Sequence, residues 1–368
     1  MKSKTMFRLR PEHSREWFRV RIYPTPAVAM FSCVLLLFLG VVAAHLIKWG
    51  LVNAVWGLPV LGDGRADLEA CKAPAAGACW AVVVQRYRFI LFGYYPYAEQ
   101  WRPLLASLIL LAVCATSALP SQWRPRTLLM WCLAVPVCLG LMNGGVLGLV
   151  RVNQSQWGGL PLVLMMATAA LVTAAPLGLL VALGRLQTSP PLIRAACATF
   201  VEFSRGIPLV TVLLVSSLMV PMLLPASWNV PNLVRAEVAL GIFMTAYLAE
   251  VFRSGIQSVP TAQFEAADSL ALPPFIKYSR VVIPQALSIS VPGIVNNTIG
   301  LFKNTSILSI IGMADITSAS QIVLSDPSFS SFYIEIYAFT SLIYAVFCLM
   351  ISKYGRFIER KLDEKRRH

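Results

Sequence analysis

The residues best suited to chemistry lie inside an apolar stretch of the sequence, from Leu287 to Ile311. Polar side chains interrupt this stretch at Asn296, Asn297, Thr298, Lys303, Asn304, Thr305 and Ser306. An intramembrane lysine costs about 3 kcal/mol on insertion scales, so a lipid-facing helix would not tolerate this set. We expect these groups to recognise a polar solute, with Lys303 binding a carboxylate. Two other roles for Lys303 stay open, namely snorkelling to the outer interface or an ion pair with Glu237 or Asp315.

Helical periodicity gathers part of this set on one side. Asn296, Gly300 and Lys303 share one helical face, because residues three, four and seven apart lie above one another. Asn297 and Asn304 lie on the adjacent strip. The residues predicted to line a substrate path are Asn296, Asn297, Gly300, Lys303, Asn304 and Thr305.

A second motif lies in the polar loop before this stretch. The segment Glu265–Ala271 is rich in alanine and carries two acidic residues, and a hydrophobic run ending in Pro284 follows it. We predict a short helix that begins after its N-cap, Thr261, and continues through the segment to the prolines at 273 and 274. A loop of this kind between membrane spans is suited to contact with another protein.

One face of that short helix carries Phe264, Ala267 and Ala271. Small side chains on this face would let the backbone of a partner approach closely. The alternative is an ordinary amphipathic connector that rests on the membrane surface.

Sequence motifs for catalysis are missing. There is no Gly-x-x-x-x-Gly-Lys-[Ser/Thr] phosphate loop and no Gly-x-Ser-x-Gly elbow, and the three histidines, His13, His45 and His368, do not have metal-site spacing. We therefore expect no catalytic residue, no metal and no cofactor bound by this chain. Energy for any transport must come from a gradient or from another subunit.

Composition indicates a membrane protein. The chain of 368 residues is 57% hydrophobic and 13% charged, whereas soluble domains carry about 25% charged residues. Its apolar runs of about 20 residues are typical of helices and not of an outer-membrane barrel. The net charge of +14 is concentrated before the first run and after the last one, which indicates anchoring to lipid at the inner face and not nucleic-acid binding.

About eight membrane-spanning helices are predicted. They are Ala27–Trp49, Pro103–Leu119, Thr127–Leu149, Leu160–Leu183, Leu209–Leu224, Val234–Val251, Leu287–Ile311 and Ile334–Ile351. With the basic amino terminus inside, most Lys and Arg of the connecting loops also fall inside, which favours an even number of spans and two cytoplasmic termini. The predicted parts are a basic N-terminus (1–26), a three-helix extension (27–156), a five-helix core (157–352) with a cytoplasmic loop (253–285), and a basic tail (353–368).

The long outer loop at 50–102 departs from this charge rule, because it carries five Lys and Arg. Charge constrains long loops less, and we predict a short interfacial helix at Tyr87–Tyr97, with a missed span as the alternative. Cys71 and Cys79 lie in the same loop. In an oxidising periplasm they form either a disulfide or two free thiols, and both states stay open.

Several segments together resemble a known family. Glu265-Ala266-Ala267 and Pro284 resemble the EAA loop of ABC importer permeases, where an ATPase subunit docks, although the glycine of that motif is replaced by Ala271. Three further segments resemble the polar-amino-acid branch of these permeases, namely Glu202–Leu209, Ala246–Val259 and Lys303-Asn304-Thr305-Ser306. The similarity covers about residues 160–356, and the front portion is similar to the long permease of general L-amino-acid importers.

This resemblance implies an all-α integral membrane protein with a five-helix type I ABC importer core preceded by a three-helix extension. It also implies a place in the bacterial inner membrane, a second homologous permease or a copy of this chain, and a periplasmic binding protein that delivers an amino acid. ABC ATPase subunits would bind the ATP and Mg²⁺ and would dock on a coupling loop. Its residues are Phe264, Glu265, Ala266, Ala267, Asp268, Ala271 and Pro284. Because Ala271 replaces the glycine, the chain is expected to stay helical there.

Three charged residues near the coupling loop have two interpretations each. Glu250 and Arg253 form either a salt bridge that latches a cytoplasmic gate or a pair of solvated residues at the end of a span. Arg205 either contacts the ATPase or anchors a short helix at the inner leaflet. Two other functions stay open for the whole chain. One is a gradient-driven amino acid carrier, and the other is a membrane scaffold without transport of its own.

Overall fold

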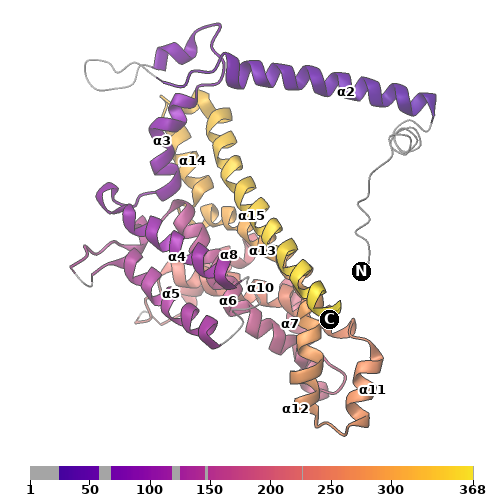
Figure 1. Ribbon diagram of the computed structural model, residues 1–368. Coiled ribbons are helices and arrows are strands. Elements are labelled where there is room, and N and C mark those ends of the chain that lie inside the picture. Colours follow the sequence, from indigo (N-terminus) through magenta and orange to yellow (C-terminus); the bar gives the residue numbers. More distant parts are fainter. Residues whose placement is uncertain (1–24, 58–67, 118–124, 146–147, 226, 368) are drawn as a thin grey trace. The chain divides into compact units, whose positions relative to one another are not determined.

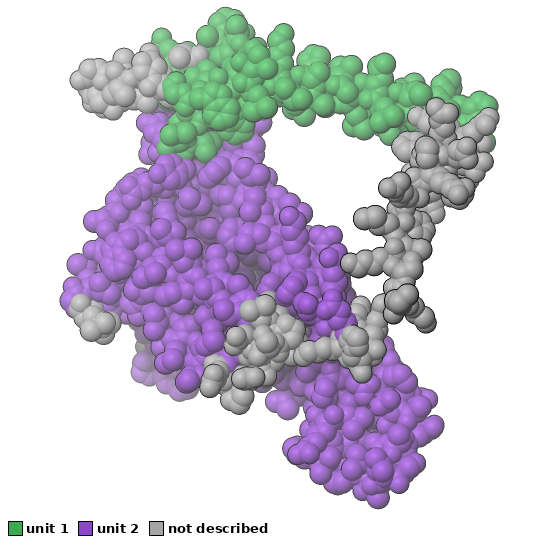
Figure 2. Space-filling model, in the orientation of Figure 1, with its two compact units in different colours: residues 1–84 green, residues 85–368 purple. Residues whose placement is uncertain are grey.

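The computed structural model describes residues 25–57, 68–117, 125–145, 148–225 and 227–367. The chain divides into two compact units, Met1–Val84 and Gln85–His368, which are described separately (Figure 2). This division falls inside the predicted N-terminal extension and not at its end. Most of the predicted basic N-terminus, residues 1–24, and the predicted inside charge Arg124 lie outside the described residues.

The first unit consists of one long helix and a small disulfide-bonded segment. Helix α2 (Pro26–Ile47) begins at Thr25, whose hydroxyl accepts a hydrogen bond from the Val28 N–H at 3.3 Å. No residue of α2 is buried, which suits a helix surrounded by lipid. After it, Cys71 and Cys79 are joined by a disulfide, one of the two states that the sequence left open.

Helices also form the second unit throughout its described part (Figure 1). Its long helices are α4 (Trp101–Ser117), α5 (Pro125–Asn143), α6 (Gly159–Gly184), α10 (Asn232–Gln257), α13 (Ile283–Asn304) and α15 (Tyr333–Arg367). Within the described residues each predicted span overlaps a helix, although α5 ends at Asn143, before the predicted end at Leu149. By length and apolar composition the described helices include four membrane spans, or five if one bent pair counts as a span, so the number eight stays a prediction.

The predicted span Leu209–Leu224 is the second part of the bent pair. Helix α7 (Pro191–Gly206) meets the segment Leu209–Leu223 at an angle of 99°. That segment consists of α8 (Leu209–Leu214), a π-helical turn and α9 (Val220–Leu223). The break falls at Ile207 and Pro208, because a residue before proline is excluded from helical conformation.

Other boundaries also differ from the prediction. The interfacial helix predicted at Tyr87–Tyr97 is instead α3 (Trp80–Phe92), which ends where Gly93 adopts a positive φ of 61°. Helix α13 changes to a 3₁₀ helix at Thr305–Ile311, and the unpredicted α14 (Ile316–Ser325) follows. Helix α15 continues through the predicted basic tail to Arg367.

A buried arginine explains part of the unexpected charge in the outer loop. Arg102 was counted with that loop, but it belongs to α4 and is fully buried. Its guanidinium donates to the carbonyl oxygens of Leu141 at 2.7 Å and Val150 at 2.8 Å, and it lies 3.5 Å from Glu99. Arg102 thus satisfies one open carbonyl at the end of α5 and one in the segment that follows it, and fixes α4 to both.

Glycines let α6, α10 and α13 pack closely. A Cβ at Gly178 of α6 would lie 3.0 Å from the Cβ of Leu248 and 3.1 Å from the backbone nitrogen of Ala249, both on α10. Further along α10, near its end, a Cβ at Gly255 would lie 2.7 Å from the carbonyl oxygen of Ala286 on α13. Helices in lipid associate through such small residues, because lipid supplies no hydrophobic drive for their association.

This packing predicts opposite effects of the same substitution at two glycines. Gly255→Ala should lower the melting temperature of the detergent-purified chain, since overpacking costs about 1–3 kcal/mol. Gly140→Ala on α5 is the matched control, because no atom lies within 4 Å of the added methyl group. It should leave the melting temperature unchanged or raise it, since alanine favours a helix over glycine by about 1 kcal/mol. Equal melting temperatures would contradict the close contact of α10 and α13.

Candidate functional site

The coupling loop contains the predicted short helix, α11 (Thr261–Ser269), followed by α12 (Pro274–Ile276). Thr261 is the first helical residue and not the N-cap, so that prediction is wrong by one position. Pro260 occupies the cap position with φ −57° and ψ 137°, an extended conformation that its ring favours. No side chain caps this helix end, and the Gln263 N–H donates instead to the Pro260 carbonyl at 3.0 Å.

The other end of α11 corrects a second prediction, because the chain turns at Ala271 instead of staying helical. Ala271 has φ 49°, and among the described residues it is the only non-glycine with a positive φ. Its N–H donates to the Asp268 carbonyl at 2.9 Å, and the Leu272 N–H donates to the Ala267 carbonyl at 3.2 Å. These two bonds are those of a Schellman motif, which a glycine usually closes. Alanine therefore adopts the conformation of the glycine that it replaces.

Two of the three residues of the predicted partner face are turned inward. Ala267 is buried and Phe264 is half-buried, with its ring 6.4 Å from that of Tyr278, whereas Ala271 is exposed. The outward surface carries Glu265 and Ala266. Asp268 is also exposed.

An ion pair holds the two sides of the loop together. The Lys277 ammonium lies 2.7 Å from the Asp268 carboxylate and 5.8 Å from the centre of the Phe264 ring. The side-chain amide of Gln285 donates to Gln263 at 3.3 Å, and Pro284 is exposed at the first turn of α13. The loop is therefore bonded to the start of α13, so a force on α11 is passed to α13.

A cluster of arginines surrounds Glu250 at the same end of α10. Glu250 is hydrogen-bonded to Arg253 and lies 2.6 Å from the guanidinium of Arg185, which directly follows α6. Arg205 of α7 lies 3.9 Å away and stacks over Tyr247, 5.5 Å from its ring centre. Glu250 thus connects α6, α7 and α10, which excludes the interpretation of Glu250 and Arg253 as merely solvated residues. Sequence reasoning missed Arg185, because it lies 65 positions from Glu250.

The polar face of α13 is open in this chain. Asn296 and Lys303 are exposed, and no atom lies within 4 Å of a Cβ placed at Gly300. On the adjacent strip, the side-chain amide of Asn297 donates to the Gly293 carbonyl at 2.8 Å, and Asn304 is half-buried. The face therefore has the arrangement that helical spacing predicts.

Thr305 does not belong to this open face. It begins the 3₁₀ helix after α13, its side chain is fully buried, and its hydroxyl donates to the Phe302 carbonyl at 2.7 Å. Residues two and nine apart lie on opposite sides of an α-helix, so Thr305 would not share the line of Lys303 and Asn296 even if α13 continued unchanged.

Neither acidic residue considered for Lys303 is its partner. Among the described residues Lys303 forms no ion pair. The carboxylate of Asp315 accepts hydrogen bonds from the N–H groups of Thr317 and Ser318 instead. The carboxylate oxygens of Glu237 are buried and have no hydrogen-bond partner in the described part of the chain. The ammonium of Lys303 is therefore free to meet a ligand or the interface.

The strained alanine predicts a stabilising substitution in the coupling loop. Ala271→Gly should raise the free energy of unfolding by up to about 1 kcal/mol, because a left-handed alanine costs about that much more than glycine. Ala266→Gly, the same change at an exposed position inside α11, should lower it by about 1 kcal/mol. Thermal unfolding of the purified chain compares the two variants. A loss of stability in both would show that residue 271 is helical, as the sequence alone predicts.

Comparison with known proteins identifies the family of this chain. Residues 174–364 match the family of binding-protein-dependent transport system inner membrane components. The chain is 36% identical to the inner membrane amino-acid ABC transporter permease protein YhdY of Escherichia coli (strain K12), over 95% of this chain and 93% of that one. It is 32% identical to the glutamate/glutamine/aspartate/asparagine transport system permease protein BztC of Rhodobacter capsulatus, over 96% and 94%.

A solved structure is also similar to part of this chain. It is a crystal structure of an amino acid ABC transporter with histidines, 33% identical, with a TM-score of 0.49 over 54% of this chain and 90% of that one. The matched residues of the family include the coupling loop, the arginine cluster around Glu250 and the open face of α13. With half of its length matched by the family and nearly all of it by relatives, the chain belongs to the binding-protein-dependent transport system inner membrane components, the permease subunits of ABC importers.

Proposed function

We propose that this chain is a permease subunit that moves amino acids inward across a bacterial inner membrane, driven by ATP hydrolysis on separate subunits. The observation that carries the proposal is α11, a short helix outside the core with exposed Glu265 and Ala266, bonded to the start of α13. A carrier driven by a gradient has no use for such a helix. The printed names of the relatives supply the substrate class, amino acids.

The proposal places the coupling loop and both termini in the cytoplasm. Arg185, Arg205 and Arg253 lie at the same end of the core as the loop, and the basic end of α15 follows the last apolar stretch. Positive charge near span ends favours the cytoplasmic side. ATP and Mg²⁺ bind to the ATPase subunits and not to this chain.

Transport in this proposal follows from the connection of α11 to α13. Closure of the ATPase subunits moves α11, and the bonds from the loop to the first turn of α13 pass this movement on. Glu250 and its arginines hold α6, α7 and α10 together at the cytoplasmic end. When these ion pairs break, the three helices separate and that end opens. The substrate then leaves along the face of Asn296, Gly300 and Lys303.

The same face implies a second permease subunit. Asn296 and Lys303 are exposed on a helix whose surroundings would otherwise be lipid, and polar groups at that depth are costly. A homologous permease, or a copy of this chain, would cover the face and enclose a path. A periplasmic binding protein would deliver the amino acid to the outer end.

The coupling role is tested by purification from native membranes in mild detergent. The complex should contain an ATPase, and Glu265→Lys should remove it, because the outward acidic face of α11 is reversed. Glu364→Lys is the control, since Glu364 is also exposed but lies at the end of α15. Retention of the ATPase by the Glu265 variant, or loss in both variants, would contradict docking at α11.

The path is tested by uptake of radiolabelled L-glutamine into proteoliposomes that contain the full complex. Lys303→Met should reduce uptake at least tenfold while the subunits still copurify, because a carboxylate loses its charged partner. Lys353→Met, which removes another exposed lysine on α15, should not change uptake. Undiminished uptake by the Lys303 variant would refute the assignment.

A further inference from the structure

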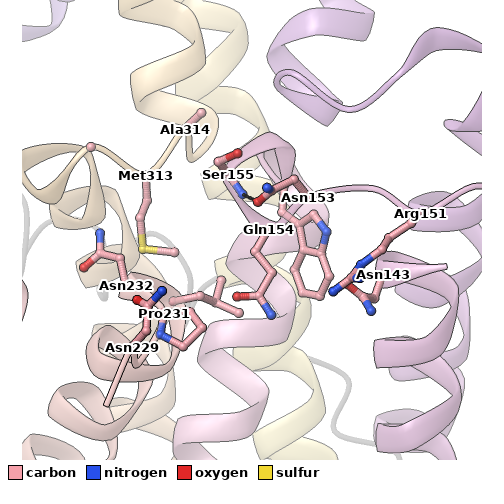
Figure 3. A pocket seen from close by; sticks show the side chains of 13 residues that line it. Asn143, Arg151, Asn153, Gln154, Ser155, Asn229, Pro231, Asn232, Met313 and Ala314 are labelled. Carbon is pink, nitrogen blue, oxygen red and sulfur yellow. Dashed lines mark hydrogen bonds between the residues drawn. The ribbon is translucent and has the colours of Figure 1, made fainter. Parts of the chain in front are cut away.

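A polar cavity lies at the other end of the core, away from the coupling loop. Its volume is about 760 Å³, which lies within the range of sites for small molecules. Three separate segments line it, residues 143–157, 229–233 and 312–314. In Figure 3, Asn229 and Asn232 lie on one side, Arg151 and Asn143 lie on the opposite side, and Gln154 lies between them.

The chain topology places this cavity opposite the coupling loop. Helix α10 begins beside the cavity at Asn232 and ends at Gln257, just before α11. Helix α6 begins next to the cavity at Gly159 and ends at Gly184, beside the arginine cluster. A helix of this length spans about 39 Å, so the cavity lies at the outer end if the coupling loop is inside.

The cavity offers hydrogen-bond donors that no protein group uses. Trp157 is 3% exposed, and its indole N–H has no hydrogen-bond partner in the described part of the chain. Arg151 is exposed and forms no ion pair with a described residue. A guanidinium and an N–H donor in the lining of one cavity suit a carboxylate. A buried tryptophan N–H usually has a partner, so an unused one marks a place for a ligand acceptor.

The same cavity has an acceptor for a positive charge. The side-chain oxygen of Gln154 is buried and has no hydrogen-bond partner among the described residues. Asn143, Asn153 and Asn232 also line the cavity, and none of the lining residues is acidic. The wall thus combines one full positive charge with several amide groups, which complements an α-carboxylate and an α-ammonium group on one small molecule.

We infer that this cavity is a binding site for a free amino acid at the outer end of the core. The inference rests on the proposed function. Arg151 and the Trp157 N–H bind the α-carboxylate, and Gln154 accepts from the α-ammonium group. The amino acid waits there after delivery, before it reaches the face of Lys303. The last helix of the predicted N-terminal extension then has a role, since Asn143 ends α5 and Arg151 lies in the segment between α5 and α6.

The test is direct binding to the full permease–ATPase complex in nanodiscs, without nucleotide and without binding protein. The probe is a uniformly ¹⁴C-labelled mixture of L-amino acids. Lys303→Met is introduced first, so that binding at the α13 face is removed and the remaining label reports the cavity. Arg151→Gln in this background should weaken binding at least tenfold, the loss expected for a charge-assisted hydrogen bond.

Trp157→Phe should also weaken binding, because it keeps the ring and removes the N–H. Trp101→Phe is the matched control, since Trp101 is exposed and does not line the cavity. Arg151 is exposed, so its variant tests the site even if the buried Trp157 variant does not fold.

Three outcomes would overturn the inference. The first is that the Lys303→Met complex binds no label. The second is that Arg151→Gln in this background binds as much label as its parent. The third is that Arg151→Gln leaves amino acid binding unchanged but weakens docking of the substrate-loaded binding protein at least tenfold. The last result would assign Arg151 to an acidic side chain of that protein. Because the assay needs no ATP, it stays informative if uptake proves to be independent of ATP hydrolysis.

Discussion

The close contact of α6, α10 and α13 is the constraint on which the rest of the structure depends. Gly178 on α6 and Gly255 on α10 remove the side chains that would separate these helices, and backbone atoms approach each other there. Lipid gives helices no hydrophobic reason to associate, so tight packing and hydrogen bonds must hold them. The Ser290 hydroxyl adds one such bond, since it lies 3.3 Å from the Val251 carbonyl across the α10–α13 contact. Because these helices are closely packed, we expect each of them to move as a rigid unit.

The packed helices connect the two regions to which we assign functions. At one end, Glu250 joins α6 and α10 through Arg185, and the coupling loop is bonded to the first turn of α13. At the other end, the segments that enter the same helices form the polar cavity. A displacement of α11 therefore has a continuous physical route to the outer end. The open face of α13 lies between the two ends, where a second subunit would complete the path.

Local features of the sequence predicted the parts that depend on local chemistry. Long apolar runs predicted α2 and α6, and helical spacing predicted the common face of Asn296 and Lys303. Features set by distant residues were not predicted. Arg185 and Glu250 are 65 positions apart, and nothing near either residue indicates their contact. The prediction that the chain stays helical at Ala271 was wrong for another reason. The preference of alanine for a helix is outweighed by the two hydrogen bonds that the left-handed turn completes.

The central claim is that transport by this chain is driven by a second, ATP-hydrolysing protein that pushes on α11. The most direct test is amino acid uptake by proteoliposomes that contain the full complex and a substrate-loaded binding protein, with the source of energy varied. The account predicts that uptake requires ATP on the side of the coupling loop and continues when a protonophore collapses the proton gradient. Uptake that stops with the protonophore and persists without ATP would contradict it, and would identify the chain as a gradient-driven carrier.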